Sequence, residues 1–173
     1  MPNDKKAGIN LHPFDVLDLE PAGRLIFTPC PGTKGVSLRE SVEQLKQAGS
    51  VAILTLMMPD EMARNNVENL PAICEENNLL WFHLPIEDDQ APAQLFEDRW
   101  LGAKSRIMDL LQSGKTLAIH CKGGTGRTGL MAAIILMHSG VQRAEAVKRV
   151  QAVRPRSLTL EPHQAYINRL SSE

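Results

Sequence analysis

The fold of this chain is decided by one stretch of sequence, His120-Cys121-Lys122-Gly123-Gly124-Thr125-Gly126-Arg127-Thr128-Gly129. We call residues 120–129 the cysteine loop. An apolar run, residues 116–119, leads into this loop, and a second apolar run, residues 130–137, leads out of it. Because glycine clusters interrupt regular structure between periodic segments, the pattern predicts a strand, a tight loop and a helix, in that order.

The cysteine loop is suited to bind an anion and to activate a thiol. A helix beginning near Gly126 would direct its free backbone N–H groups and the positive end of its dipole into the loop. Glycines allow successive backbone amides to turn inward around an anion. Such surroundings favour a thiolate, so we expect Cys121 to be a nucleophile. Arg127 can hold two phosphoryl oxygens with its planar fork, and Thr128 can donate a hydrogen bond to the sulfur.

The rest of the chain shows alternating strand and helix patterns. Ser37, with Glu40 three residues later and Gly49 at the end, marks one helix by its capping residues. We expect strands over residues 24–28, 51–57, 79–84 and 116–120. We expect helices over residues 37–48, 59–66, 68–77, 93–112, 125–139, 143–153 and 161–170. This order predicts an α/β fold with a central, mainly parallel twisted sheet of four to five strands flanked by helices.

Composition narrows the class of protein further. A chain of 173 residues with a net charge of −1 fits one domain, residues 1–173, whose first ten residues are expected to fray. The charge does not favour nucleic-acid or membrane-surface binding, and no apolar run reaches the length of a membrane span. The N-terminus lacks the apolar core of a signal peptide. Three unevenly spaced cysteines form no disulfide framework, so we expect a cytoplasmic location.

The cysteine loop resembles the signature of the cysteine-dependent protein tyrosine phosphatase superfamily, His-Cys-x5-Arg-Ser/Thr-Gly. Every fixed position of that signature is present: His120, Cys121, Arg127, Thr128 and Gly129. The resemblance, which extends over residues 20–172, implies the phosphatase fold and hydrolysis through a phosphocysteine intermediate. We expect His120 to orient the loop through backbone bonds rather than to act as a base, and phosphate to bind to the loop residues Lys122, Gly123, Gly124, Thr125, Gly126 and Arg127. We expect no metal or other cofactor, since the five histidines lack ligand spacing.

A general acid is expected in the acidic segment Leu84-Pro85-Ile86-Glu87-Asp88-Asp89-Gln90-Ala91-Pro92, which we call the acid loop. This segment resembles the acid-bearing loop of small dual-specificity phosphatases of the cyclin-dependent-kinase-associated type. The resemblance implies that Asp88 is the general acid, with Asp89 as a close alternative and Glu87 as a more distant one. The tail of the chain resembles these enzymes too, which implies that Gln164 could place the hydrolytic water.

The resemblance also implies a class of substrate. Tyrosine-specific members are larger and deepen their cleft with an extra loop, so this short chain is expected to act on phosphotyrosine and also on phosphoserine or phosphothreonine in proteins. Lipid phosphatases often carry two lysines in the loop, whereas this loop has Lys122 but Thr125 at the later position. A phosphoinositide or other small phosphate ester remains an alternative substrate. A non-catalytic phospho-binding module is the alternative from another class of protein.

Overall fold

The computed structural model describes residues 10–170; residues 1–9, which form most of the segment expected to fray, and residues 171–173 lie outside that range. Within residues 10–170, one five-stranded sheet has the order β1-β2-β5-β3-β4. Its first pair, β1 and β2, is antiparallel, and the other neighbours are parallel. The mainly parallel α/β fold predicted from the sequence is confirmed. The strands are β1 (Asp15–Asp18), β2 (Arg24–Thr28), β3 (Ser50–Thr55), β4 (Leu80–His83) and β5 (Thr116–His120).

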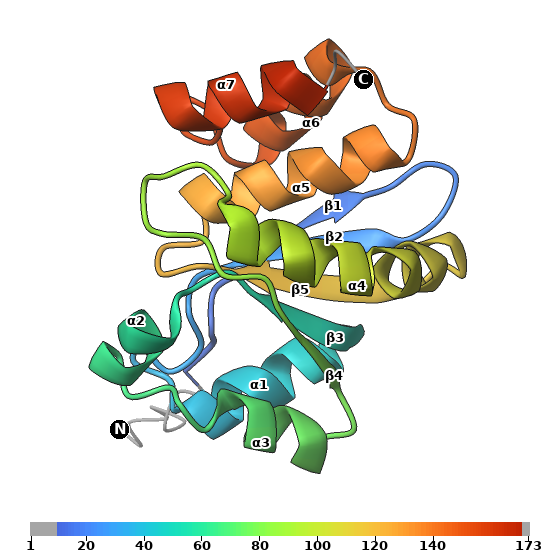
Figure 1. Ribbon diagram of the computed structural model, residues 1–173. Coiled ribbons are helices and arrows are strands. Elements are labelled where there is room, and N and C mark those ends of the chain that lie inside the picture. Colours follow the sequence, from blue (N-terminus) through green and yellow to red (C-terminus); the bar gives the residue numbers. More distant parts are fainter. Residues whose placement is uncertain (1–9, 171–173) are drawn as a thin grey trace, which may run out of the picture.

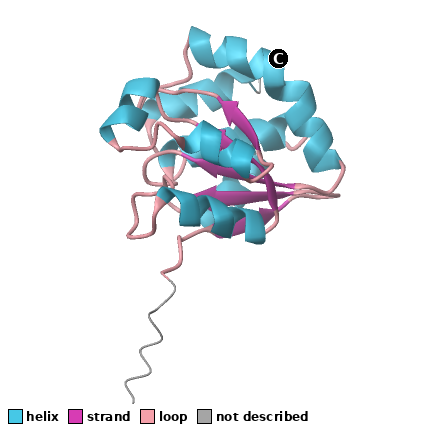
Figure 2. Ribbon diagram, turned by 90° about the horizontal axis from the view of Figure 1, so that it is seen from below, coloured by secondary structure: helices cyan, strands magenta, loops and turns pink. Residues whose placement is uncertain are grey.

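The helices cover both faces of the sheet, as Figure 1 shows. On one face lie α4 and α5, with α6 and α7 packed beyond them; α1 and α3 lie on the other face. The view from below in Figure 2 shows the strands enclosed between helices in the same way. The helices are α1 (Leu38–Gln47), α2 (Pro59–Arg64), α3 (Leu70–Glu76), α4 (Gln94–Gln112), α5 (Gly126–His138), α6 (Arg143–Val153) and α7 (Glu161–Leu170).

The central strands are buried on both faces, because helices cover both sides of a parallel sheet. Their side chains alternate between the two faces. Phe27 of β2 and Ile119 of β5 belong to the core under α4 and α5. Ile26 and Ala118, one residue earlier in each strand, belong to the core against α1 and α3. The sheet therefore divides the hydrophobic core into two layers and holds β5, which leads into the cysteine loop, rigidly between them.

Several predicted elements match the structure closely, and one strand was not predicted. The bounds of β2, β5, α6 and α7 are those expected from the sequence, and Ser37 accepts a hydrogen bond from the Glu40 backbone N–H, as the capping pattern predicted. The unpredicted strand is β1, a short and largely exposed edge strand. Among the described residues, none of the helices is long and apolar enough to cross a membrane.

The parallel strands end together at one edge of the sheet. The cysteine loop follows β5, the acid loop follows β4, and α2 follows β3. In open α/β sheets, binding crevices form at the carboxyl ends of the strands. This edge is therefore where residues from three separate parts of the sequence meet.

Candidate active site

The cysteine loop wraps its backbone and side-chain donors around a buried sulfur. Cys121 is 4% exposed, and its Sγ accepts hydrogen bonds from the Gly124 backbone N–H at 3.3 Å and from the Thr128 hydroxyl at 3.2 Å. Helix α5 begins at Gly126, so its free N–H groups and its dipole face the loop. The sulfur therefore lies where negative charge is stabilised, as expected for a nucleophilic cysteine.

Gly124 is required by the shape of this loop. Its φ is +78°, a conformation that favours glycine. A Cβ at this position would lie 2.6 Å from the Pro29 backbone nitrogen and 2.6 Å from the Thr28 carbonyl carbon. Because both of these atoms are backbone, they cannot move aside as a flexible side chain could. The loop thus packs directly against the chain that leaves β2.

Arg127 is buried and held by a carboxylate that the sequence did not reveal. Its Nη1 and Nη2 each donate to one carboxylate oxygen of Glu61, both at 2.7 Å, and Nη1 also donates to the Ile86 carbonyl at 2.9 Å. Burial alone would raise the pKa of Glu61, but the hydrogen bonds and charge of Arg127 outweigh it and lower that pKa. The Nε of Arg127, also buried, has no hydrogen-bond partner within residues 10–170. This N–H is a donor available to a phosphoryl oxygen.

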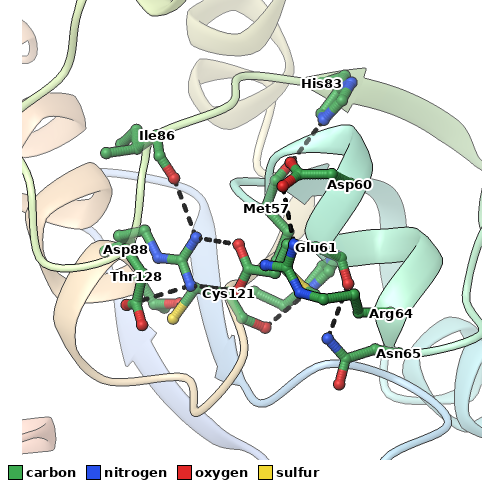
Figure 3. Close-up of polar contacts among 12 residues, drawn as sticks. Met57, Asp60, Glu61, Arg64, Asn65, His83, Ile86, Asp88, Cys121 and Thr128 are labelled. Atoms are coloured by element: carbon green, nitrogen blue, oxygen red, sulfur yellow. Dashed lines mark hydrogen bonds and ion pairs between the residues drawn. The ribbon is translucent and has the colours of Figure 1, made fainter.

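Asp88 lies at the exposed side of the same guanidinium. Its Oδ1 is 3.3 Å from Nη2 of Arg127, and the Asp88 side chain is 70% exposed. In Figure 3, Asp88 and Thr128 lie together with the sulfur of Cys121, and Glu61 approaches from α2 on the other side. The neighbouring Asp89 has a φ of +61°, and among the described residues the carboxylates that pair with Arg127 are those of Glu61 and Asp88. The contacts thus bring Asp88, rather than Asp89, to the cysteine loop.

His120 connects the cysteine loop to the sheet through a chain of buried hydrogen bonds. Its Nδ1 is 3.0 Å from the Cys121 carbonyl oxygen, which can only accept, so Nδ1 carries the proton. Its Nε2 then accepts from the Thr55 hydroxyl at 2.7 Å, and the Thr55 oxygen accepts from the Trp81 indole N–H at 2.8 Å. Burial lowers the pKa of His120 to about 4. The neutral ring thus links the Cys121 backbone to Thr55 of β3.

Two further contacts hold the cysteine loop from the C-terminal part of the chain. Arg154 donates from Nε to the Gly124 carbonyl at 3.1 Å and from Nη2 to the Phe27 carbonyl at 3.3 Å. Ser157 donates its hydroxyl to the Thr125 carbonyl at 2.7 Å. A Cβ on Gly129 would lie 2.2 Å from that hydroxyl oxygen. The last glycine of the loop signature is therefore the residue that lets Ser157 approach α5.

The structure brings most of the expected site residues together. Cys121, Arg127, Thr128, Asp88 and His120 contact one another or share a hydrogen-bonded partner. Lys122 and Gly123 are exposed at the mouth of the loop, and Thr125 and Gly126 are partly exposed beside it.

Gln164, like Asp89, is an expected site residue that the structure does not bring to the cysteine loop. Its side-chain amide donates to the Leu158 carbonyl at 3.0 Å, and it lines a groove of about 320 Å³ between α6 and α7. The contacts therefore give no support to the expectation that Gln164 places a water at the sulfur. The preceding residue of α7, His163, faces the site instead.

Glu61 is the main residue that the sequence analysis missed. The segment around it was predicted only as a helical piece in a connecting region. One signal could have found it: Glu61 follows the strand predicted over residues 51–57, which belongs to the predicted parallel sheet. A carboxylate that follows a central parallel strand lies at the same edge of the sheet as the cysteine loop.

Solved structures with the same fold include known phosphatases. The structure of kinase associated phosphatase with its catalytic-site cysteine replaced by serine superposes with a TM-score of 0.81 at 19% identity, covering 96% of this chain and 99% of that one. The active form of Tk-PTP superposes with a TM-score of 0.68 at 22% identity, covering 91% of this chain and 97% of that one. The fold and the site thus define the class: a protein with the fold of the cysteine-dependent phosphatases.

The chain belongs to the family described as "Polymorphic toxin system, DSP-PTPase phosphatase", whose model matches residues 31–141. Curated relatives include cyclin-dependent kinase inhibitor 3 of Rattus norvegicus, 26% identical over 134 residues, or 72% of this chain and 60% of the relative. The same protein of Homo sapiens is 27% identical over 117 residues, or 62% of this chain and 51% of that one. The chain thus spans between about half and 60% of the length of these relatives. The predicted resemblance to small dual-specificity phosphatases of the kinase-associated type is confirmed.

Proposed function

We propose that this protein is a phosphatase that hydrolyses phosphate monoesters on protein side chains, phosphotyrosine and also phosphoserine or phosphothreonine. The observation that carries the proposal is the arrangement around Cys121: a buried sulfur bonded by Gly124 and Thr128, beside a guanidinium whose Nε is buried and unpaired within the described part of the chain. Membership in a phosphatase family supports the same activity.

The first step transfers the phosphoryl group to sulfur. The Cys121 thiolate attacks phosphorus, so that an S–P bond forms while the P–O bond to the leaving group breaks. Arg127 and the backbone N–H groups of the cysteine loop hold the three non-bridging oxygens and stabilise their charge. The Asp88 carboxyl group gives its proton to the leaving oxygen. This role is supported for Asp88 by its position 3.3 Å from Arg127.

The second step releases inorganic phosphate. Water attacks the phosphocysteine, and the Asp88 carboxylate takes a proton from that water. The S–P bond breaks, and the electron pair returns to the sulfur of Cys121. The Thr128 hydroxyl, 3.2 Å from Sγ, stabilises the departing thiolate with a hydrogen bond.

Hydrolysis of 4-nitrophenyl phosphate tests the proposal. Activity should persist in the presence of a chelator and should be inhibited by vanadate. Replacement of the nucleophile, Cys121→Ser, should abolish turnover. Asp88→Asn should slow turnover more than Asp89→Asn. A Cys121→Ser variant with full activity would exclude the mechanism, and absence of hydrolysis by the unmodified protein would favour a phospho-binding module.

A substrate panel separates protein from lipid substrates. The panel should contain peptides with phosphotyrosine, phosphoserine and phosphothreonine, together with inositol phosphates. Lys122 is the one lysine in the cysteine loop, which supports a preference for substrates with a single phosphate group. We further propose a cytoplasmic location, which is supported by the three free, buried cysteines.

A further inference from the structure

His163 is a buried histidine on α7 that the steps above do not use. It is 1% exposed, and its Nε2 lies 2.9 Å from the carbonyl oxygen of Gln90 in the acid loop. Because that oxygen can only accept, the proton is on Nε2, and Nδ1 is an acceptor. Nδ1 is buried without a hydrogen-bond partner in the described residues. A buried polar atom without a partner costs free energy, so packing alone would favour an apolar residue here.

The imidazole of His163 lies between the two loops of the site. A Cβ on Gly126, the first residue of α5, would lie 3.9 Å from its Cε1. The pKa of His163 is lowered, mainly because the ring is buried and also because Arg127 is nearby. The hydrogen bond to the Gln90 carbonyl and the negative charges of Asp89 and Asp88 raise this pKa, but they do not outweigh burial. The ring is therefore neutral near pH 7 and donates only through Nε2, to the acid loop.

The acid loop is anchored on both sides of Asp88. Before Asp88, the Ile86 N–H donates to the Leu56 carbonyl at 2.9 Å, and the Ile86 carbonyl accepts from Arg127. After Asp88, the turn is closed by a bond from the Gln90 N–H to the Glu87 carbonyl at 3.1 Å. Residues 87–90 are all exposed, so this turn has no buried side chain of its own to hold it. The bond from His163 to the Gln90 carbonyl supplies the anchor on that side.

We propose that His163 is a positioning residue that holds the turn of residues 87–90, and with it Asp88, over the cysteine loop. It acts through its Nε2–H bond to the Gln90 backbone and takes no part in proton transfer. The proposal rests on the proposed phosphatase function, and it adds a residue that acts through the general acid. Loss of the bond should therefore resemble partial loss of Asp88 and should leave phosphate binding intact.

The test compares two aryl phosphates in three variants. His163→Phe keeps a planar ring but has no hydrogen-bond donor, and His163→Gln restores a donor. Gln164→Ala is the control, because it changes the next residue of α7, which lines the groove away from the site. Phenyl phosphate has a poor leaving group that needs protonation, whereas 4-nitrophenyl phosphate has a good one that needs it less. We expect His163→Phe to lower kcat/KM about tenfold or more for phenyl phosphate and less than about threefold for 4-nitrophenyl phosphate.

Three controls make the outcome decisive. The inhibition constant of vanadate should be unchanged in His163→Phe, since the cysteine loop is intact, and His163→Gln should recover most of the lost activity. In an Asp88→Asn background, His163→Phe should have no further effect, because it acts through that carboxyl group. The proposal would be overturned if His163→Phe lowered kcat/KM equally for both substrates and also weakened vanadate binding. It would also be overturned if kcat/KM fell for neither substrate. If the unmodified protein hydrolyses neither ester, the proposed function itself fails, which is a separate result.

Discussion

The guanidinium of Arg127 and the carboxylate of Glu61 form two parallel hydrogen bonds of 2.7 Å in the interior of the site. This arrangement fixes both the position and the plane of the guanidinium. It also leaves Nε directed away from Glu61, as the donor that can meet a phosphoryl oxygen. Glu61 thus prepares Arg127 for phosphate before any substrate binds, and much of the expected catalysis depends on such preorganisation.

Glu61→Gln should damage both stability and activity. The amide keeps the shape of the side chain but can accept only one of the two N–H bonds, and it leaves the buried guanidinium with only the exposed Asp88 carboxylate as a nearby counter-charge. We expect the free energy of unfolding to fall by about 2 kcal/mol and kcat/KM to fall about tenfold or more. Asp60→Asn is the matched control, because Asp60 forms an exposed ion pair with Arg64, and solvent-exposed ion pairs contribute little to stability. Urea unfolding and steady-state kinetics measure both effects, and equal effects of the two variants would contradict this interpretation.

Gly124→Ala should distort the cysteine loop. The added methyl group would meet backbone atoms of Thr28 and Pro29 at 2.6 Å, and the residue would have to keep a positive φ. We expect a loss of about 2 kcal/mol in the free energy of unfolding, with nearly complete loss of vanadate binding. A Cβ on Gly123 meets nothing within 4 Å, so Gly123→Ala should change stability by less than about 0.5 kcal/mol. If Gly124→Ala and Gly123→Ala had the same free energy of unfolding, the close approach of Gly124 to Pro29 would not limit the stability of the loop.

Thr128→Val should slow the second chemical step. Valine has the same shape but donates no hydrogen bond to Sγ of Cys121, so the departing thiolate keeps the Gly124 N–H and loses the Thr128 hydroxyl as a donor. We expect breakdown of the phosphocysteine to slow about tenfold, which makes a burst of 4-nitrophenolate visible in stopped-flow measurements. Thr128→Ser keeps the hydroxyl and should show no such burst. A burst of equal size in both variants would assign the effect to packing.

Arg154→Ala should loosen the cysteine loop from outside. Arg154 holds the Gly124 and Phe27 carbonyls and forms an ion pair with Asp15. Loss of these charged hydrogen bonds should lower the free energy of unfolding by about 2 kcal/mol and weaken vanadate binding several-fold. The control is Arg156→Ala, since Arg156 is exposed on the same loop. Vanadate inhibition that stays unchanged in Arg154→Ala would show that the loop keeps its shape without this residue.

Stability should fall as the pH drops below about 6.5, because the folded state holds His120 with its pKa lowered to about 4 by burial. Between pH 6.5 and about pH 4, His120 is protonated in the unfolded chain but neutral in the folded chain. The free energy of unfolding therefore decreases as the pH falls. For His120 alone the loss between pH 7.5 and pH 5 is about 2 kcal/mol. The pKa values of His12, His83 and His163 are also lowered, and these histidines act in the same direction.

Urea unfolding at pH 7.5 and pH 5.0 measures this dependence. In His120→Asn, which keeps a polar side chain but cannot titrate, the difference between the two pH values should be smaller by about 2 kcal/mol. An unchanged difference would show that His120 is not the group that resists protonation.

The local parts of the fold and the site were predictable because their signals are local. The strand, loop and helix around Cys121 follow from apolar runs and glycines, and the cap at Ser37 follows from its spacing to Glu40. β1 was not predictable in this way, since its four residues, Asp15–Asp18, form an exposed edge strand without a buried face of its own. Its position comes from pairing with β2, which no local pattern reveals.

Contacts between residues that are far apart in the sequence could be identified only from the structure. Glu61 and Arg127 are 66 positions apart in the sequence, and the position of Glu61 after a strand indicates the edge of the sheet but not that Arg127 is its partner. The buried face of α7 follows from local spacing, because His163, Tyr166 and Ile167 share the helical spacing of a buried stripe. Gln164 lies about 100° further around the helix, where it lines the groove between α6 and α7 and not the cysteine loop.

The contacts made by β2 and by the C-terminal helices determine the shortest fragment of the chain that is expected to fold and to keep its active site. The family match covers residues 31–141, yet β2 pairs with β5 along its length, and Arg154, Ser157 and His163 hold the two loops from beyond residue 141. A fragment trimmed to the matched part would keep the pairing of β5 with β3 but would expose its other side as a sheet edge, which is prone to aggregation. Expression trials should therefore keep the chain from β1 to α7.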